Sequence, residues 1–228
     1  MSSRYFMDLT SFKHTLPPLQ ERVELGVLCE ALGLKVGLEI GVQRAEFTRE
    51  ILEKWKSFEK MYLLDPWEAQ TNYVDIANKN NDEHEKILRQ AKKNVAPFQN
   101  AASDKIEFIR GYSNTKANMF DDLSLDYVYV DARHDYCGVS EDISLYWPKV
   151  SCGGILAGHD YLSADEVNFL TKKQNWALCG NGTIHLGAVR TAVNEFADRH
   201  KVQLMVTYRE RYHFNSWYMR KTCNTGRQ

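Results

Sequence analysis

The sequence of 228 residues has no apolar stretch near the roughly 18 residues that a helix needs to cross a bilayer, so we expect no membrane-spanning segment. It has no excess of either charge, because 29 basic and 30 acidic residues leave a formal net charge of -1. The basic surface typical of proteins that bind nucleic acid or an anionic membrane is therefore not expected. The first residues also lack the apolar core of a signal peptide, which predicts a cytoplasmic protein.

Cysteine is scarce, and its spacing matches neither a disulfide-rich scaffold nor a zinc motif. The cysteines are Cys29, Cys137, Cys152, Cys179 and Cys223. Their number is odd and they are scattered along the chain. We therefore expect free thiols in a reducing compartment.

What the chain does contain is an ordinary globular composition, with 43% hydrophobic and 26% charged residues. Its length suits one domain with elaborations, which we place over residues 34–220. An arm and helix precede the domain over residues 1–33, and a tail follows over residues 221–228. Residues 162–186 are irregular and predict a lid or acceptor-binding loop. Residues 1–16 are expected to be disordered, to close over a site or to pack on the partner of a homodimer.

The rest of the predicted sheet is built around residues 36–47, V-G-L-E-I-G-V-Q-R-A-E-F, here called the organising stretch. Apolar residues alternate up to Ile40 and predict a buried strand. The pattern breaks at Gly41, and a helical pattern with Phe47 and Ile51 on one face follows. A strand that runs through a glycine turn into a helix opens a doubly wound α/β sheet, which binds ligands beyond the carboxyl ends of its strands.

The chemistry of this turn favours a cationic ligand over a dinucleotide. The fingerprint G-x-G-x-x-G is incomplete, because V-Q-R-A follows Gly41 and the second glycine is missing. Glu39, near the end of the strand, would repel a diphosphate and attract a cation. S-adenosylmethionine carries an ammonium and a sulfonium but no phosphate, and it fits better. The alternative is that Glu39 is merely a solvated residue at a strand end.

Polar residues end three further strands. Asp65 ends a strand over residues 60–65 and lies 24 residues after Gly41, where an acid typically accepts hydrogen bonds from ribose hydroxyls. A turn aspartate before proline is the alternative there. Asp131 ends the fourth strand, and Asp160 follows the fifth. Because parallel strands end at one edge of a sheet, these acids should gather there.

Asp131 and Asp160 are expected to lie so close that they share a proton or hold a cation. Oxygen ligands favour a hard ion such as Mg2+, while a pair of solvated, loop-capping acids is the alternative. His134, three residues after Asp131, can take a proton from a hydroxyl at neutral pH, and the alternative is that it only caps or orients Asp131. His159 is the competing base.

With these motifs the chain resembles class I S-adenosylmethionine-dependent methyltransferases over residues 34–220, and among them the sugar and catechol-type O-methyltransferases. The resemblance is carried by the organising stretch and by Y-L-L-D-P-W, F-I-R-G-Y-S, L-D-Y-V-Y-V-D-A-R-H-D-Y and G-G-I-L-A-G-H-D-Y. It implies a Rossmann-like, doubly wound α/β sheet of seven strands, mostly parallel with an antiparallel C-terminal strand. Residues 202–208 and 216–220, joined by a short turn, independently predict an antiparallel pair.

The resemblance also implies roles for individual residues. The cofactor contacts it implies are Glu39, Gly41, Asp65, Trp67, Gly111, Tyr112, Ser113 and Asp131. Among these, Glu39 and Gly41 would hold the methionine part, Trp67 would lie near the adenosine, and the sequence Gly111-Tyr112-Ser113 would border the adenine.

The resemblance extends to the metal and the base. Asp131 and Asp160 match the metal ligands of the catechol-type enzymes, and His134 stands where those enzymes place a basic lysine. The sequence departs from the family pattern at two positions. Ala45 stands where a glycine is common, and Tyr161 stands where a third metal ligand often lies.

We therefore predict an S-adenosylmethionine-dependent O-methyltransferase acting on a small molecule. A divalent ion at Asp131 and Asp160 would orient the acceptor hydroxyl, and His134 would deprotonate it. The alternatives are a metal-free methyltransferase with His134 or His159 as base, a nicotinamide oxidoreductase, and a binding module without turnover. The oxidoreductase explains the glycine turn but not Glu39 or the acids at the strand ends.

Overall fold

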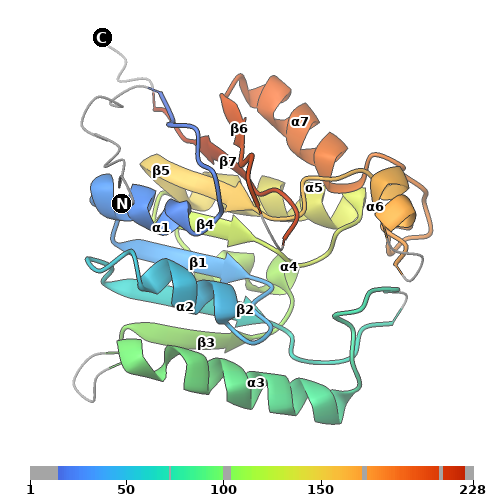
Figure 1. Cartoon of the computed structure of the whole chain (residues 1–228), viewed down its shortest axis with the longest axis horizontal. Coiled ribbons are helices and arrows are strands. Elements are labelled where there is room, and N and C mark those ends of the chain that lie inside the picture. The colour runs from blue at the N-terminus through green and yellow to red at the C-terminus, as the bar shows by residue number, and fades with distance from the viewer. Residues whose placement is uncertain (1–14, 72, 100–103, 171–173, 211–212, 224–228) are drawn as a thin grey trace, which may run out of the picture.

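The central feature of the computed structural model is a seven-stranded sheet in the order β3-β2-β1-β4-β5-β7-β6 (Figure 1). The structure describes residues 15–71, 73–99, 104–170, 174–210 and 213–223. The strands are β1 Val36–Ile40, β2 Lys60–Asp65, β3 Ile106–Arg110, β4 Leu125–Val130, β5 Val150–Gly158, β6 Leu204–Val206 and β7 Trp217–Arg220. Strands β1 to β5 pair in parallel, whereas β7 is antiparallel to both β5 and β6. The predicted fold class, including the antiparallel C-terminal pair, is confirmed.

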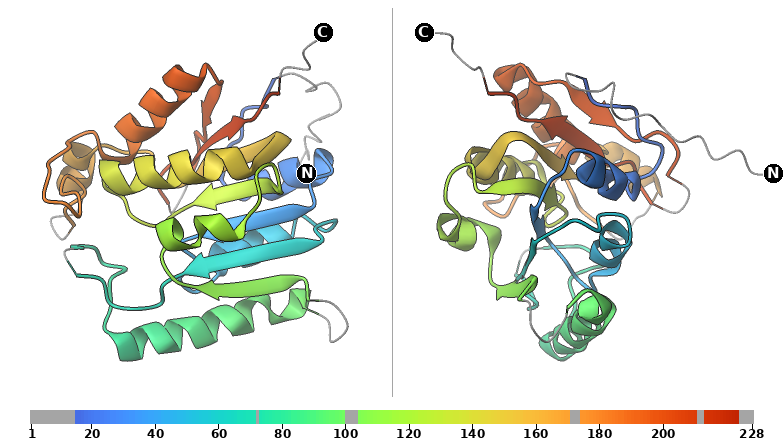
Figure 2. Two further views of the ribbon diagram at one scale, coloured as in Figure 1. Left: turned by 180° about the vertical axis from the view of Figure 1, so that it is seen from behind. Right: turned by 90° about the vertical axis from the view of Figure 1, so that its left-hand side faces the viewer.

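Helices cover both faces of the sheet (Figure 2). The helices are α1 Glu24–Ala31, α2 Glu46–Leu52, α3 Asn81–Val95, α4 Ser113–Lys116, α5 Tyr136–Tyr146, α6 Ala164–Leu170 and α7 Ala188–His200. Short 3-10 turns follow three of them, at Ala96–Phe98, Ala117–Met119 and Trp147–Lys149. Helices α1, α2 and α3 pack on one face, and α5, α6 and α7 pack on the other.

Strand β4 shows why both faces are buried. Tyr127 and Tyr129 pack into the layer of α1, α2 and α3, whereas Val128 and Val130 pack into the opposite layer. All four side chains are buried, as expected for a central strand of a parallel sheet covered on both faces. The five parallel strands point in one direction, toward the side that carries α6 and the loop segments over residues 66–71 and 73–80 (Figure 1). Residues at the strand ends are thereby brought to a single edge.

The glycine turn after β1 depends on a backbone conformation that glycine adopts readily. Gly41 has a φ of +85°, and a Cβ there would lie 1.9 Å from the carbonyl oxygen of Asp131. Only glycine lets the ends of β1 and β4 approach this closely. Ala45, the N-cap of α2, is also left-handed with a φ of 55°, which explains why a glycine would suit that position.

The segment predicted as an irregular lid contains helix α6 within residues 162–186. The rest of that segment has no regular strand or helix in its described part, apart from an isolated antiparallel bridge between Leu178 and Ile184. Residues 1–14 of the predicted arm and residues 224–228 of the predicted tail lie outside the described residues. None of the described helices combines the length and apolar character that a bilayer crossing demands.

The expectation of free thiols is wrong for four of the five cysteines. Cys137 in the first turn of α5 is disulfide-bonded to Cys179, and Cys152 in β5 is bonded to Cys223 beyond β7. Cys29 in α1 is the free cysteine of the described chain, and it is buried. The bonded partners are 42 and 71 residues apart, so the fold rather than a local motif brings them together.

Candidate active site

A cavity of about 650 Å³ opens at the carboxyl ends of the parallel strands. Its lining includes the strand-end residues that the sequence singled out, namely Glu39, Gly41, Asp65, Asp131, His134, His159 and Asp160. A smaller pocket of about 80 Å³ adjoins it and shares the walls at Gly41 and Pro66. The geometry expected for a doubly wound sheet therefore holds, with the polar groups of four strands around one hollow.

Asp65, at the end of β2, fixes the glycine turn. Its carboxylate accepts hydrogen bonds from the backbone N–H groups of Val42 and Gln43, both at 2.9 Å, and of Trp67 at 2.6 Å. Burial raises the pKa of Asp65, although these three donors oppose the shift. The carboxylate thus ties the end of β2 to the turn after β1.

Glu39 is a buried carboxyl group beside that turn. Burial raises its pKa to about 8, and the hydroxyl of Thr48, which donates to it at 2.5 Å, only partly offsets this. The nearby guanidinium of Arg22 also favours the charged form. At neutral pH Glu39 is therefore largely protonated, and a cationic ligand in the cavity would be needed to ionise it.

The guanidinium of Arg22 is the cation that opposes the raised pKa of this carboxyl group. It lies over the ring of Phe47 at 4.7 Å and lines the cavity. Its Nε atom is buried and has no hydrogen-bond partner in the described part of the chain. Sequence reasoning missed Arg22, because it precedes α1 in a segment without a recognisable motif.

The smaller pocket is bordered by Gly111, Tyr112 and Ser113, the residues that the resemblance placed at the adenine. Sequence reasoning missed a fourth residue there, Asp142 of α5, whose pKa burial raises to about 7. The signal was present, because Asp142 lies on the buried face of α5 between apolar residues at helical spacing. A carboxyl group on such a face marks a site or a structural hydrogen bond.

The structure corrects the position expected for Trp67. Its side chain is fully buried and lines neither cavity. The ring packs against Phe108 with 5.8 Å between centroids, and its Nε1–H donates to the backbone oxygen of Gln43 at 3.0 Å. A left-handed φ of 42° at Trp67 accompanies this inward direction. Trp67 supports the turn from the core and does not contact the cavity.

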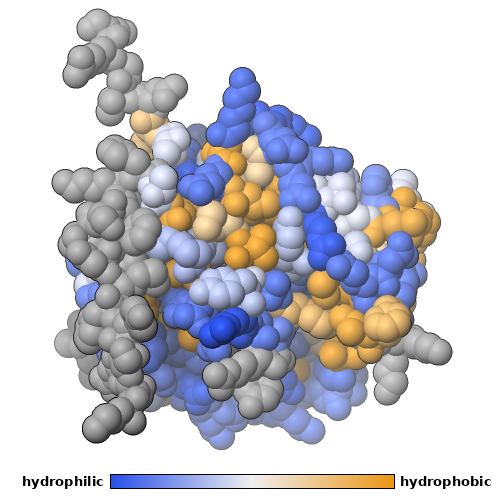
Figure 3. All heavy atoms as spheres, turned by 45° about the horizontal axis from the view of Figure 1, so that its top comes forward, coloured by the Kyte–Doolittle hydropathy of each residue, from blue (hydrophilic) through white to orange (hydrophobic). Residues whose placement is uncertain are grey.

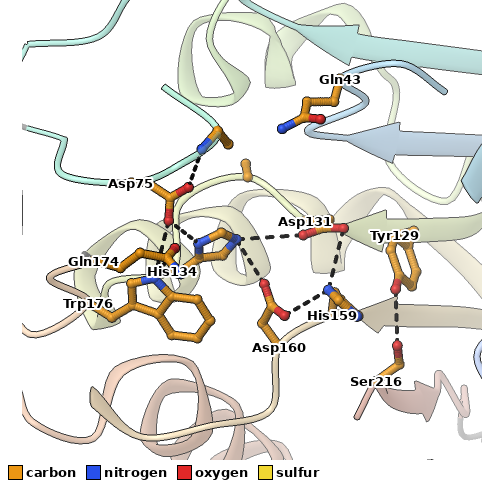
Figure 4. Close-up of polar contacts among 12 residues, drawn as sticks. Gln43, Asp75, Tyr129, Asp131, His134, His159, Asp160, Gln174, Trp176 and Ser216 are labelled. Atoms are coloured by element: carbon orange, nitrogen blue, oxygen red, sulfur yellow. Dashed lines mark hydrogen bonds and ion pairs between the residues drawn. The ribbon is translucent and has the colours of Figure 1, made fainter. Parts of the chain in front are cut away.

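Two acids and two histidines form a closed ring of contacts, here called the acid–histidine ring (Figure 4). His134 Nε2 lies 3.0 Å from Asp160 Oδ2 and 3.6 Å from Asp131 Oδ1. His159 Nδ1 lies 2.8 Å from Asp160 Oδ1 and 3.7 Å from Asp131 Oδ2. Each histidine therefore contacts both carboxylates: His134 lies against one oxygen of each, and His159 lies against the other oxygen of each.

The charges in the acid–histidine ring balance one another. Burial alone would raise the pKa of Asp160, but His159 and His134 hold it down at about 2. Burial alone would lower the pKa of His134, but the carboxylates of Asp160, Asp131 and Asp75 raise it well above its ordinary value. Asp160 also has a left-handed φ of 59°, a conformation that aspartate tolerates better than most residues.

Two irregular segments complete the surroundings of His134. Asp75 Oδ2, from the loop after β2, lies 3.1 Å from His134 Nδ1. Trp176, from the segment after α6, donates its Nε1–H to the same oxygen at 3.2 Å and packs its ring 4.5 Å from that of His134. The hydroxyl of Tyr73 lies 3.3 Å from His134 Nδ1. Nothing in the sequence marked Asp75, because it follows no strand and belongs to no motif.

Tyr161, which stands where a third metal ligand often lies, points elsewhere. Its hydroxyl donates to Asn194 Oδ1 of α7 at 2.6 Å, and the guanidinium of Arg190 lies over its ring at 5.3 Å. In the described part of the chain, the ligand atoms that gather at this edge come from Asp131, His134 and Asp160, all within 4.8 Å of one another.

Comparison with known proteins fits this geometry. A family model described as a methyltransferase domain matches residues 38–161. No curated protein matches the sequence.

Several solved structures share the fold. An O-methyltransferase from Bacillus cereus, solved in complex with SAH, is 16% identical with a TM-score of 0.59, over 87% of this chain and 80% of that one. The O-methyltransferase TomG from Streptomyces achromogenes is 11% identical with a TM-score of 0.56, over 87% and 78%. The methyltransferase PaMTH1 from Podospora anserina is 12% identical with a TM-score of 0.54, over 88% and 78%. At such identities the likeness concerns the fold.

Proposed function

Because the chain belongs to the family of methyltransferase domains, we propose that it transfers the methyl group of S-adenosylmethionine to a hydroxyl group of a small molecule. The observation that carries the proposal is the buried Glu39 beside the Gly41 turn, in the same cavity as the acid–histidine ring. The cavity thus combines a carboxyl group suited to a cationic amino acid with groups suited to deprotonating an alcohol.

The cofactor would extend from the large cavity into the small one. Glu39 would accept the ammonium of the methionine part, and Gly41 lets the backbone approach it closely. Asp65 lines the cavity beside the turn, where it would reach the ribose. Gly111 and Ser113 border the small pocket that would receive the adenine.

The experiment that tests the function is a calorimetric titration with SAH, with NAD as the contrasting ligand, followed by a screen for products labelled from S-adenosylmethionine. We expect SAH to bind and NAD not to bind, because the Gly41 turn lacks the second glycine that lets a backbone approach a diphosphate. Binding of NAD without SAH would overturn the proposal in favour of an oxidoreductase. Binding of SAH without any labelled product from a broad set of alcohols would favour a binding module.

Cofactor binding is expected to expel a proton from Glu39. The carboxyl group has a pKa of about 8 and is largely protonated at neutral pH, while the ligand ammonium stabilises its ionised form. We expect roughly one proton to be released per SAH bound at neutral pH, and progressively less as the pH rises through that pKa. The measurement is the binding enthalpy in buffers of different ionisation heat.

The matched variant for this prediction is Glu39→Gln, which keeps the size of the side chain but cannot ionise. It should bind SAH without proton release and about 10- to 100-fold more weakly, as expected for the loss of a buried charge-assisted contact. Unchanged proton release in Glu39→Gln would assign the proton to another group, such as Asp142 in the small pocket.

A divalent ion fits the acid–histidine ring. The donor set is that of a metal site, because carboxylate oxygens of Asp131 and Asp160 lie within 4.8 Å of one another and of an imidazole nitrogen. When bound there, a divalent ion supplies the positive charge that holds the acceptor oxygen and lowers the pKa of its hydroxyl. Asp131 and Asp160 would hold it, while His159 contacts the other carboxylate oxygen of each acid.

The proton of the acceptor hydroxyl would pass to His159. Both nitrogens of His134 have partners, since Nδ1 faces Asp75 and Nε2 faces Asp160. His159 lines the cavity and uses Nδ1 toward the two acids, whereas its Nε2 has no hydrogen-bond partner among the described residues. Burial lowers the pKa of His159, but the carboxylates of Asp160 and Asp131 raise it overall, and a divalent ion held by these acids would offset their charge. The neutral imidazole, which donates through Nδ1, would then keep a lone pair on Nε2 that can accept a proton.

Removal of the ion should stop turnover but not cofactor binding. After treatment with a chelator, we expect methyl transfer to fall about 100-fold or more, because the ion contributes several kcal/mol to stabilising developing charge. SAH affinity should stay within about 3-fold, since the contacts proposed for the cofactor are with Glu39, Asp65 and the Gly41 turn and not with the ion. Added Mg2+ or Mn2+ should restore the rate. Full activity in protein shown by elemental analysis to be metal-free would favour the metal-free alternative.

The acceptor site would be built from the two segments that face the acid–histidine ring. Ile76 and Trp176, which line the cavity, come from those segments. Large apolar side chains nearby are exposed, and they are Val74, Phe169, Leu170, Ile184 and Leu186. Figure 3 shows apolar surface gathered on the side of the molecule that carries α6. This surface favours an acceptor with an aromatic or aliphatic part over a purely polar one.

A further inference from the structure

We propose that His134 is the third protein ligand of the divalent ion and that Asp75 positions it, so that the site selects a transition ion over magnesium. The inference rests on the proposed function, because the ion is the one assigned there to Asp131 and Asp160. It changes the role expected for His134 from a base to a ligand. It also adds Asp75, from an irregular loop, to the site.

The first observation is the direction in which the imidazole ring of His134 points. His134 Nε2 points between the two acids, 3.0 Å from Asp160 Oδ2 and 3.6 Å from Asp131 Oδ1 (Figure 4). These three atoms therefore enclose one small space from three sides. The other oxygens of the two acids face His159, at 2.8 and 3.7 Å, and are not needed to hold an ion.

The second observation is the contact made by the other nitrogen of the same ring. His134 Nδ1 faces Asp75 Oδ2 at 3.1 Å, and that oxygen also accepts from Trp176 Nε1–H at 3.2 Å. A histidine that binds a metal almost always donates its other N–H to a carboxylate or carbonyl, which fixes the ring and the tautomer. Asp75 stands at that outer position, and its side chain is 1% exposed.

Packing holds the imidazole in this direction. The ring of Trp176 lies 4.5 Å from that of His134, and the side chain of His134 is 13% exposed. A proton acceptor has to turn a free lone pair toward the substrate, whereas here the inward nitrogen faces two carboxylates. The arrangement is that of a ligand, and the unpartnered Nε2 of His159 remains for the proton.

The donor set determines which ions the site prefers. Mg2+ is bound through oxygen and keeps most of its waters, so an imidazole adds little to its binding. Imidazole nitrogen suits Fe2+, Ni2+, Cu2+ and Zn2+, and the affinity of a given site for divalent ions rises from Mn2+ through Fe2+, Co2+ and Ni2+ to Cu2+. Two carboxylates with one imidazole should therefore bind Co2+ or Mn2+ more tightly than Mg2+.

Mn2+ binding tests the proposal without reference to turnover. Metal-free protein is titrated with Mn2+, and free Mn2+ is followed by electron paramagnetic resonance, for the wild type, His134→Phe and Asp75→Asn. His134→Phe keeps an aromatic ring against Trp176 but has no nitrogen that could bind the ion. It should weaken Mn2+ binding by more than the roughly 10- to 100-fold usual for an outer partner, while Asp75→Asn should cost about 10-fold. Mg2+ binding should fall much less in His134→Phe.

Pulsed electron paramagnetic resonance gives the direct signature. Mn2+ on the wild type should show coupling to one histidine nitrogen that is lost in His134→Phe. The control is His200→Phe on α7, a histidine that likewise stacks on an aromatic ring, at 4.2 Å from Phe196. It should change neither the coupling nor the affinity.

Two results would overturn the assignment. One is Mn2+ bound without nitrogen coupling, and the other is equal Mn2+ affinity in the wild type and His134→Phe with lost turnover, which would return His134 to the role of base. SAH is titrated into the same samples. If SAH binds and only the nitrogen coupling is absent, the inference fails alone, whereas absence of SAH binding in the wild type would overturn the proposed function itself.

Discussion

Gly41→Ala is expected to abolish measurable cofactor binding and to destabilise the fold by about 3 kcal/mol or more. The added Cβ would lie 1.9 Å from the carbonyl oxygen of Asp131 and 2.7 Å from the Cα of Ala132. These are backbone atoms, so no side chain can rotate to relieve the contact. The N–H of Asp131 donates to the oxygen of Ile40 at 2.8 Å, and separating β1 from β4 would lengthen this bond.

Gly33→Ala is the control for Gly41→Ala. Gly33 also has a left-handed φ, of +68°, but a Cβ there meets nothing within 4 Å. It should therefore show only the backbone cost, about 1–2 kcal/mol, and leave SAH affinity unchanged. Denaturant unfolding measures the stability and calorimetry the affinity. A folded Gly41→Ala protein that bound SAH like the wild type would show that the turn is not where the cofactor lies.

Asp160→Asn should separate turnover from cofactor binding. On the proposed role of Asp160, we expect turnover to fall about 100- to 1000-fold, because its carboxylate would help to hold the ion and the ion would contribute several kcal/mol. SAH affinity should stay within about 3-fold, as Asp160 has no contact with Glu39 or the turn. Asparagine tolerates the left-handed φ of 59° about as well as aspartate, so the backbone should keep its course.

The control for that variant is Asp165→Asn in the first turn of α6, where the same change is made on an exposed acid. Asp165→Asn should leave turnover and SAH affinity unchanged. Steady-state kinetics and SAH calorimetry on each protein are the measurements. Equal losses of turnover and SAH affinity in Asp160→Asn would mean that Asp160 holds the cofactor or the fold, and not an ion.

The sheet and one rim of the site could be predicted from the sequence because parallel strands end at the same edge. Once the strands before Asp65, Asp131 and Asp160 are recognised, their last residues must lie near one another, whatever the loops do. No long-range geometry has to be guessed. The antiparallel pair of β6 and β7 followed in the same way from a short connection.

The remaining parts of the site depend on contacts between irregular segments. Such segments have no periodic pattern of apolar residues from which their contacts could be predicted. Asp75 and Trp176 are 101 residues apart and meet only because both segments fold over His134. Trp67 was misplaced because a left-handed turn, and not strand alternation, sets its direction. The pairing of Cys137 with Cys179 likewise needed the fold to be known.

The left-handed backbone at Asp160 has an evolutionary consequence. Besides aspartate, asparagine and glycine are the residues that accept this conformation readily, and a single nucleotide change in an aspartate codon reaches either of them. A lineage could thus lose the negative charge in one step while the backbone keeps its conformation. On the role proposed for Asp160, descendants of such an event would bind the cofactor without turning it over.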